Sequence, residues 1–338
     1  MSNPFTQLHL PPRTANWQGA DRRVGVELEF GAISARTGAS LVQALFGGTI
    51  EEEDPHRFHV CDTELGKFVC ELDTQYAHRA VGEDAYTQPS GQEDAVGGMI
   101  ASFRYEMRRL YGEISSLIVP CEIVCPPIPL AAMPRLDAMV GALQAAGAEG
   151  TRSSPFYAFG AQLNPDIATT DAGWLTAMLK AYLLVSAWLR AVIQVHTTRR
   201  LVAFADPFAR EYVADVVDAG YWPSLEDLMR DYLAANPTRN RELDLLPLFA
   251  WLDAALVRGA VPDHRIKARP TFHYRLPDAN LGVPGWSLTL EWNRWCVVER
   301  LAENRALLDD MGAAYRANLK RTFPEDWAIR ASEWLLLC

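Results

Sequence analysis

The sequence RVGVELEFGA, residues 23–32, alternates apolar side chains with glycines and glutamates. Side chains along a β-strand point alternately to the two faces of a sheet. One face of this predicted strand is therefore apolar and carries Val24, Val26, Leu28 and Phe30. The other face carries Glu27 and Glu29 between two glycines. Two carboxylates so close together raise each other's pKa unless a cation neutralises them, so the sequence predicts a cation beside this strand.

Further predicted strands show the same division into an apolar and a polar face. They lie in KFVCELD (67–73), SLIVPCEIVC (116–125), YAFGAQLN (157–164), TFHYRLP (271–277) and WSLTLEW (286–292). The polar faces carry Glu71, Asp73, Glu122, Gln162, Asn164, His273, Arg275, Ser287, Thr289 and Glu291. This division is typical of an antiparallel sheet with one covered face. We therefore expect most of these polar side chains to share the open face of a single sheet.

The order of elements along the chain predicts an α+β protein. Strands come first, a mainly helical insertion follows at about 171–262, and strands return after it. Asp171 is the predicted N-cap of a long helix that ends near His196. Other helices are predicted near residues 39–46, 99–111, 133–146, 207–219, 225–234, 245–258 and 294–319. We expect one domain over residues 1–338, with helices covering one face of the sheet.

Composition and charge exclude several classes of protein. The 338 residues are 49% hydrophobic with a net charge of −10, and the absence of a basic patch argues against nucleic acid as a partner. The N-terminus lacks the charged and apolar regions of a secretory signal. The apolar stretch 174–195 contains Lys180 and Arg190, which predicts a buried helix rather than a membrane span. Six cysteines without CxxC spacing favour free thiols in the cytoplasm.

The composition of the polar face favours a binding site over a solvated surface. Lysine is nearly absent from it, carboxylates dominate, and small residues leave it open. Such a face suits oxygen-preferring cations such as Mg²⁺ or Mn²⁺. Glu71 and Asp73 have an equally good alternative reading, because acids at a hairpin edge keep a sheet soluble.

Four segments in this order resemble one known family. They are GVELEF (25–30), CEIVCPPIPL (121–130), FGAQLNPD (159–166) and RPTFHYRLPD (269–278). They are similar to the amidoligase branch of the glutamine-synthetase-like carboxylate–amine ligases. The resemblance implies a curved antiparallel sheet whose open face binds ATP with Mg²⁺ or Mn²⁺. It also implies that a substrate carboxylate is phosphorylated and that an amine then displaces the phosphate to give an amide or peptide bond.

The resemblance implies a role for each matching position. Glu27, Glu29 and Glu122 become metal ligands, and Arg275 binds the transferring phosphoryl group or the substrate carboxylate. His273 stands where glutamine synthetase has a glutamate, and we include it among the metal ligands, although a hydrogen-bonded structural histidine is an equal alternative. The remaining candidates are Glu71 for catalysis and Gln162, Asn164, Lys267 and Arg269 for nucleotide binding. Lys267 and Arg269 have the alternative of simply flanking their strand.

The expected partners are a small-molecule or peptide carboxylate and an amine. The resemblance adds a glutamine amidotransferase-like partner protein. Two other functions stay open on the sequence alone. One is a metal-dependent hydrolase that uses the same carboxylates without ATP. The other is a relative that kept the fold and binds ligands without catalysis, which the substitutions at Gln162, Asn164 and His273 favour.

Overall fold

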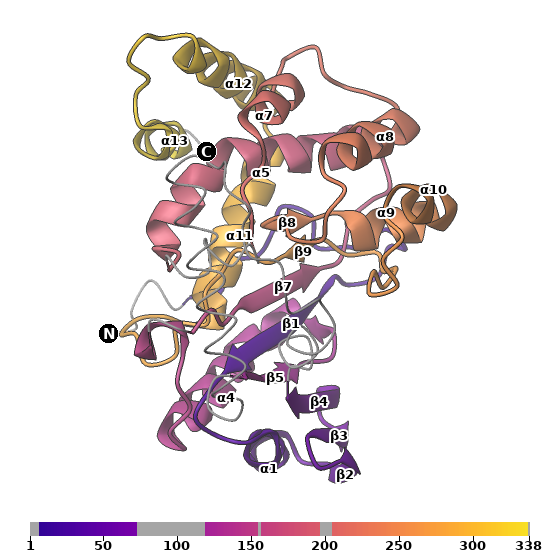
Figure 1. Ribbon diagram of the computed structural model, residues 1–338, viewed down its shortest axis with the longest axis vertical. Coiled ribbons are helices and arrows are strands. Elements are labelled where there is room, and N and C mark those ends of the chain that lie inside the picture. The colour runs from indigo at the N-terminus through magenta and orange to yellow at the C-terminus, as the bar shows by residue number, and fades with distance from the viewer. Residues whose placement is uncertain (1–6, 73–118, 155–156, 197–204, 337–338) are drawn as a thin grey trace, which may run out of the picture.

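The computed structural model describes residues 7–72, 119–154, 157–196 and 205–336, and these form a mixed α+β protein (Figure 1). The helix predicted at 99–111, Asp73, and the first residues of the strand predicted at 116–125 lie outside the described residues. The sheet in the described part of the chain has nine strands. They are β1 (Arg23–Phe30), β2 (Thr49–Asp54), β3 (Arg57–Thr63), β4 (Gly66–Leu72), β5 (Cys121–Val124), β6 (Ile128–Pro129), β7 (Ala161–Pro165), β8 (Leu243–Asp244) and β9 (His273–Tyr274).

The sheet is antiparallel and open, with the order β2-β3-β4-β5-β1-β7-β9-β8. In Figure 1 it runs from β2 at the bottom of the view to β8 near the centre. The short strand β6 pairs with the start of β1. The sheet thus joins strands from the first third of the chain to β9, which follows the helical insertion. The predicted antiparallel α+β fold is confirmed.

Strand β1 is paired on both sides and shows the predicted alternation. The side chains of Val24, Val26, Leu28 and Phe30 are fully buried. Its partners contribute Ile123 of β5 and Leu163 of β7 to the same apolar face, both also fully buried. Because each register is fixed by backbone hydrogen bonds, Glu27 and Glu29 are held on the opposite face.

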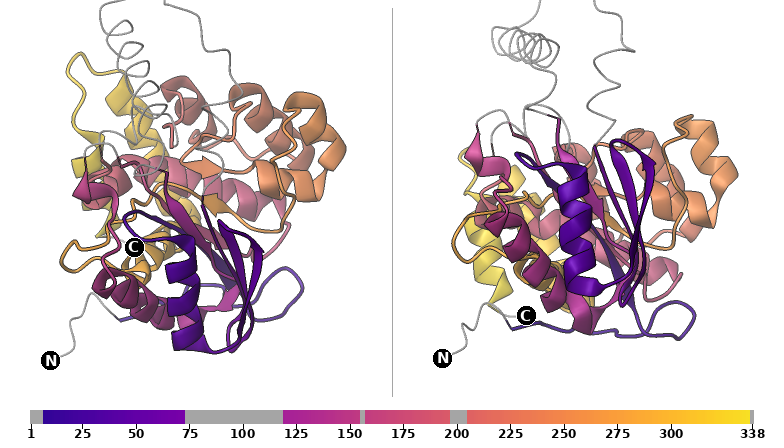
Figure 2. Two further views of the ribbon diagram at one scale, coloured as in Figure 1. Left: turned by 60° about the horizontal axis from the view of Figure 1, so that its bottom comes forward. Right: turned by 90° about the horizontal axis from the view of Figure 1, so that it is seen from below.

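Helices cover the apolar face of the sheet. Helix α1 (Ala35–Phe46) packs on β3 and β4, α4 (Met133–Ala145) packs on α1 and on α11 (Leu288–Ala302), and α5 (Ala172–Ile193) packs on α11. Figure 2 shows α1 and α4 together on one side of the strands. The helices are α1 (Ala35–Phe46), α4 (Met133–Ala145), α5 (Ala172–Ile193), α7 (Arg210–Val216), α8 (Leu225–Ala235), α9 (Leu246–Leu252), α10 (Ala254–Ala260), α11 (Leu288–Ala302), α12 (Arg305–Leu319) and α13 (Trp327–Leu335). The face away from α1 and α4 is called the open face below.

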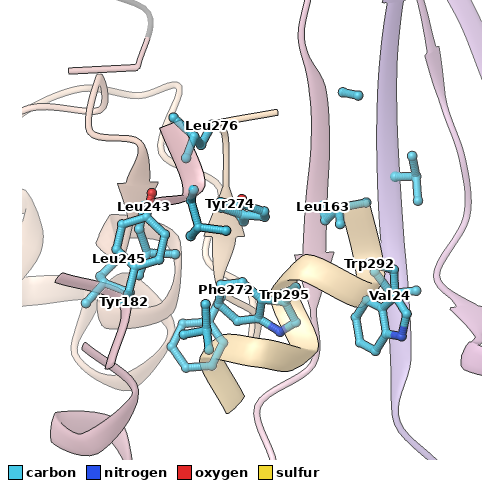
Figure 3. Close-up of a cluster of buried hydrophobic side chains, with 14 of the residues drawn as sticks. Val24, Leu163, Tyr182, Leu243, Leu245, Phe272, Tyr274, Leu276, Trp292 and Trp295 are labelled. Carbon is cyan, nitrogen blue, oxygen red and sulfur yellow. The ribbon is translucent and has the colours of Figure 1, made fainter. Parts of the chain in front are cut away.

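The centre of the core lies between the sheet and α11. Figure 3 shows Leu163 of β7 and Tyr274 of β9 beside the indole rings of Trp292 and Trp295. The ring of Tyr274 lies 5.3 Å from that of Trp295 and 5.9 Å from that of Tyr182 on α5. Close aromatic pairs of this kind add to the burial of their large apolar surfaces.

The helical insertion begins as predicted. The Asp171 side chain accepts a hydrogen bond from the Trp174 amide and caps α5. Helix α5 is long and apolar enough to cross a membrane by length and composition, but 72% of its apolar window is buried inside the protein. The insertion also contains β8, a two-residue strand that pairs with β9 and was missed in the sequence.

The strand predicted at 286–292 is wrong, because this segment starts a helix. The Ser287 hydroxyl accepts a hydrogen bond from the Leu290 amide and caps α11. Leu288, Trp292 and Trp295 then recur at helical spacing and point into the core. The alternation covered only seven residues, and a window that short cannot separate a strand from the first turns of a helix. Glu291 therefore belongs to α11 and not to the open face.

A buried ion pair joins the start of β1 to α11. Arg22 and Glu299 form two hydrogen bonds of 2.7 Å, from Nη1 to Oε2 and from Nη2 to Oε1. Their side chains are 0% and 3% exposed. Arg22 also donates to the carbonyl oxygens of Arg13 and Asp166, and Trp295 Nε1 donates to Glu299. The pair is therefore fully satisfied by hydrogen bonds although it is removed from water.

We expect Arg22→Met to lower the free energy of unfolding by about 3–5 kcal/mol, because it leaves the Glu299 carboxylate buried without its partner. The double variant Arg22→Met with Glu299→Leu should recover part of this loss. The matched control is Arg13→Met, which removes the exposed ion pair with Glu303 and should cost less than about 1 kcal/mol. Urea denaturation measures all three, and equal losses in the two single variants would contradict the prediction.

Candidate active site

Three carboxylates lie in one row across neighbouring strands of the open face. Glu71 of β4 is opposite Glu122 of β5, and Glu122 is opposite Glu29 of β1. Directly opposite side chains on one face have Cβ atoms roughly 5 Å apart. These three residues, called the carboxylate row below, were all predicted site residues, and the sheet brings them together.

Glu29 is the most buried member of the carboxylate row. Its Oε2 accepts a 2.7 Å hydrogen bond from the Gly160 amide, and its Oε1 accepts a 3.4 Å bond from Gln162 Nε2. Gly160 directly precedes β7 and Gln162 belongs to it, so both donors come from the strand that pairs with β1. Because Gly160 has no side chain, the carboxylate can reach the backbone there. Buried carboxylates are held in this way by hydrogen-bond donors.

Glu27 meets a cation supplied by the protein itself. Its Oε1 accepts a 3.0 Å hydrogen bond from Asn164 Nδ2 and lies 3.4 Å from Arg269 Nη1. Arg269 Nη2 donates to Asn164 Oδ1 at 2.8 Å. The guanidinium therefore bridges two of the predicted site residues. Arg269 therefore offsets part of the negative charge of Glu27 in this structure, and the predicted metal ion stays a prediction.

Two further positive charges, those of Arg57 and Lys267, act on the outer end of the carboxylate row. Burial raises the pKa of Glu71, and the charges of Arg57 and Lys267 oppose that increase. Arg57 Nε lies 2.7 Å from Glu71 Oε2. Lys267 and Arg269 belong to the segment between α10 and β9, so this segment passes over the open face. Their predicted role in nucleotide binding stays a prediction.

His273 is buried within the polar network of the open face. Its Nε2 lies 2.6 Å from Gln162 Oε1. Because the Gln162 amide nitrogen donates to Glu29, we assign the ring proton to Nε2 and the lone pair to Nδ1. Burial lowers the pKa of His273 well below its ordinary value, and the charges of Arg275, Arg269 and Arg239 lower it further. The imidazole is therefore neutral at pH 7.

Asp244 lies behind His273 and was missed in the sequence. Its Oδ2 lies 3.7 Å from His273 Nδ1, and its Oδ1 accepts a hydrogen bond from the Leu246 amide. Burial raises the pKa of Asp244 to about 6, and the charge of Arg275 opposes the increase. The segment RELDLLP, residues 241–247, places Glu242 and Asp244 two positions apart, as Glu27 and Glu29 are. This spacing of two acidic residues could have indicated a strand. The apolar residues that follow it, however, predicted only a helix at 245–258.

Arg275 lies just beyond β9 on the same face as His273. Extending the β7–β9 register from Leu163 opposite Tyr274 places Arg275 opposite Gln162. Gln162 in turn is opposite Glu27. Two strand spacings therefore separate Arg275 from Glu27, roughly 10 Å along the sheet. The predicted site residues on β1, β4, β5, β7 and β9 thus share one face, with Arg275 toward its β9 edge and further positive charges beside Glu27 and Glu71.

The donor set fits Mg²⁺ or Mn²⁺ in its chemistry but is not gathered around one point. Within the described residues, no three His, Cys, Asp or Glu side chains lie close enough together to hold a metal ion. The carboxylate row supplies the oxygen ligands that these ions prefer, from strands that are hydrogen-bonded neighbours. Glu29 and Glu122 are directly opposite each other, and Glu27 lies two positions from Glu29 on the same face of β1, so these three carboxylates could share an ion if their side chains turned toward one another.

The chain matches a known protein family. A family model described as "Putative amidoligase enzyme" matches residues 20–297 of the chain. The match begins just before β1 and ends within α11, so it contains all the strands of the described sheet. No curated protein and no solved structure matched the chain.

We expect the stability of Asp244→Asn relative to the wild type to rise between pH 4 and pH 7. The folded-state pKa of Asp244 is raised from its ordinary 3.8 to about 6, so the wild type loses stability as the pH rises through this window. The shift corresponds to about 3 kcal/mol, which the uncharged asparagine does not lose.

Denaturation at four pH values in this range measures the difference between the two proteins. Asp310→Asn is the control, since it removes the same charge from an exposed side chain. A difference between Asp244→Asn and the wild type that stays constant with pH would show that the neighbouring arginines already compensate the Asp244 carboxylate.

Proposed function

The chain belongs to the amidoligase family of ligase-type enzymes, and from that premise we propose that it is an ATP-dependent carboxylate–amine ligase. It would join a small-molecule or peptide carboxylate to an amine through an acyl phosphate. One observation carries the proposal beyond the family. The open face holds the carboxylate row at one end and Lys267, Arg269 and Arg275 beside or beyond it. Phosphoryl transfer from a nucleotide needs both a metal site and cations for the phosphate oxygens.

The carboxylates are assigned to the metal. We propose that Glu27, Glu29 and Glu122 hold Mg²⁺ or Mn²⁺, with His273 as a further candidate ligand that would first have to move the proton it donates to Gln162 from Nε2 to Nδ1. A divalent ion bound there supplies charge neutralisation for the phosphates. Gly160 and Gln162 hold the Glu29 carboxylate in position, and Asn164 does the same for Glu27.

The cations are assigned to the phosphates and the substrate carboxylate. Arg269 and Lys267 lie over the carboxylates and would bind nucleotide phosphates, next to Asn164 and Gln162. Arg275 offers a planar fork of donors that suits a phosphoryl group or a carboxylate. In the proposed first step, a carboxylate oxygen of the substrate attacks the γ-phosphorus of ATP and ADP leaves.

Glu71 is assigned to the second step. The amine nitrogen attacks the carbonyl carbon of the acyl phosphate, inorganic phosphate leaves, and the nitrogen loses a proton. Burial raises the pKa of Glu71, which brings this carboxylate closer to the pH at which a general base is effective. Glu71 also belongs to the same row as the proposed metal ligands, so it is close to the place where the acyl phosphate would form.

The proposal includes a cytoplasmic location and a glutamine amidotransferase-like protein as a partner. All five cysteines in the described part of the chain are free, which agrees with a reducing compartment. Neither nucleic acid nor a membrane is expected as a partner.

The metal assignment predicts a change in ligand-linked stability. Mg²⁺ or Mn²⁺ at 100 times its dissociation constant should stabilise the wild type by about 2.7 kcal/mol, seen as a rise in Tm. Glu27→Gln with Glu29→Gln should abolish this rise. The control is Glu51→Gln with Glu53→Gln, which changes two acids at the same spacing on the exposed edge strand β2. An unchanged metal-linked rise in Tm in the Glu27/Glu29 variant would show that this pair is not the ligand.

The ligase assignment predicts ADP release that requires Mg²⁺ or Mn²⁺, an acid and an amine together. Pools of carboxylates and amines, including peptides, identify the substrates. Arg275→Lys should then lower ADP release by roughly 10²-fold, because the lysine keeps the charge but loses the fork of donors. ATP affinity should change much less, since the metal and Arg269 would still hold the phosphates.

The outcomes separate the three functions. Equal ADP release by Arg275→Lys and the wild type would make Arg275 structural. Amide cleavage that needs metal but no nucleotide would identify a hydrolase. Metal-dependent ATP binding without ADP release from any pool would identify a relative that binds without catalysis.

A further inference from the structure

A pocket of about 160 Å³ opens at the β8–β9 edge of the sheet, at the opposite end of the open face from the carboxylate row. In Figure 1 this edge lies next to α8, α9 and α10. The pocket is lined by segments that follow α8, α10 and β9. Its polar lining residues are Thr238, Arg239, Asn240, Asp263, Arg265 and Arg275. We call it the arginine pocket.

The lining of the arginine pocket has more positive than negative charge. It contains three guanidinium groups and one carboxylate, that of Asp263. Asp263 is engaged by Arg265, which donates to it from the backbone amide, from Nε at 2.9 Å and from Nη2 at 2.8 Å. These bonds lower the pKa of Asp263 to about 2. The carboxylate is therefore ionised and already committed to one arginine.

Arg239 is left with little compensation. Among the described residues its one ion pair joins Nη1 to Asp263 Oδ2 at 3.9 Å, longer than a hydrogen bond. The side chain is only 16% exposed. Burial lowers the pKa of Arg239, and the charge of Arg275 lowers it further, while Asp244 and Asp263 oppose the change. A buried guanidinium beside other cations is stabilised when an anion enters.

The buried carboxylate of Asp244 does not neutralise the excess positive charge of the arginine pocket. It is fully buried and lies beside His273, and its Oδ1 already accepts the Leu246 amide. Counting Asp244 with the lining still leaves three guanidiniums against two carboxylates. The volume of the pocket is several times what one water molecule needs, so it has room for a small oxyanion and its waters.

We propose that Arg239 and Arg265 of the arginine pocket bind a second carboxylate or a phosphate group of the acid substrate, while Arg275, on the side of the pocket nearest β9, keeps its proposed role toward the reacting group, so that the enzyme selects acids with a second negative group. The inference rests on the proposed ligase function, which makes the occupant part of the substrate. Guanidinium forks match the planar or tetrahedral oxygens of such groups. Thr238 and Asn240 add neutral hydrogen-bonding groups to the same lining. ATP is assigned elsewhere, because its phosphates go with the metal at the carboxylate row.

Calorimetric titration at constant ionic strength tests the proposal without any turnover. The probes are glutarate, inorganic phosphate and butyrate, the last of which has a single carboxylate. We expect the wild type to bind glutarate or phosphate more tightly than butyrate. Arg239→Gln should weaken the tighter binding roughly tenfold or more, the size expected for losing a charged hydrogen-bonding partner. Tighter binding of phosphate would identify a phosphorylated acid, and tighter binding of glutarate a dicarboxylic acid.

Two further variants control the experiment. Arg265→Gln changes a side chain that is 45% exposed, so the fold should persist, and it should weaken the same binding. Arg230→Gln on α8 removes an exposed arginine of the same insertion that pairs with Glu226, and it should leave the affinities unchanged. Affinities for glutarate and phosphate that are equal in Arg239→Gln, Arg265→Gln and the wild type would overturn the proposal.

A fourth probe separates the substrate from the nucleotide. If Arg239→Gln weakens the binding of ATP with Mg²⁺ and leaves glutarate and phosphate binding intact, the pocket belongs to the nucleotide and the proposal is wrong. Failure of the ligase function has a different signature. In that case ADP release is absent with every acid, while the charge-selective binding and its loss in Arg239→Gln persist and support an oxyanion site.

Discussion

The pairing of β1 on both sides is the constraint on which the rest of the structure depends. Hydrogen bonds to β5 and β7 fix its register, and its apolar side chains are completely buried under the helices. A slip of one residue would move Glu27 and Glu29 into that core and expose the valines. The observed register is therefore strongly favoured over a one-residue slip, and it places the two glutamates on the open face. The positions of Glu122, Gln162 and Asn164 follow from the same registers.

The negative charge of the carboxylates on the open face is compensated by other groups of the protein. Carboxylates on adjacent strands repel one another and lose water as they are buried. Gly160 and Gln162 supply hydrogen bonds to Glu29, and Arg269 supplies a positive charge to Glu27. Arg57 and Lys267 act on Glu71. The same lysine and arginine are the groups that we propose for the nucleotide phosphates, so in this proposal the charges that stabilise the face without a ligand also serve phosphoryl transfer.

Charge is distributed unevenly along this face, and in the proposed reaction this distribution would orient the acid substrate. The carboxylate row lies on β4, β5 and β1, where Arg57 and Arg269 accompany Glu71 and Glu27, and three further guanidinium groups gather at the arginine pocket beyond β9. The neutral His273 and Gln162 connect the two ends through hydrogen bonds. An acid whose reacting carboxylate lies near the metal would place its remaining atoms toward the arginine pocket. The helical insertion and the residue that follows it supply Arg239 and Asp263, so this part of the chain contributes side chains to the arginine pocket as well as covering the sheet.

The sequence by itself determined the elements whose local signals were unambiguous. Alternation over eight residues defined β1, and the Asp171 cap defined the start of α5. Alternation also placed Glu71, Glu122, Gln162, His273 and Arg275 on one face, because side-chain direction in a strand is a local property. Alternation over seven residues was misleading at 286–292, where the Ser287 cap and the burial of Trp292 and Trp295 favour a helix. Only the tertiary structure decided that β8 joins the sheet, that Asp244 lies behind His273, and that Arg239, Arg265 and Arg275 meet in one pocket. Those contacts join residues far apart in the chain, and the burial that shifts the pKa of Asp244 exists only after the insertion packs against the sheet.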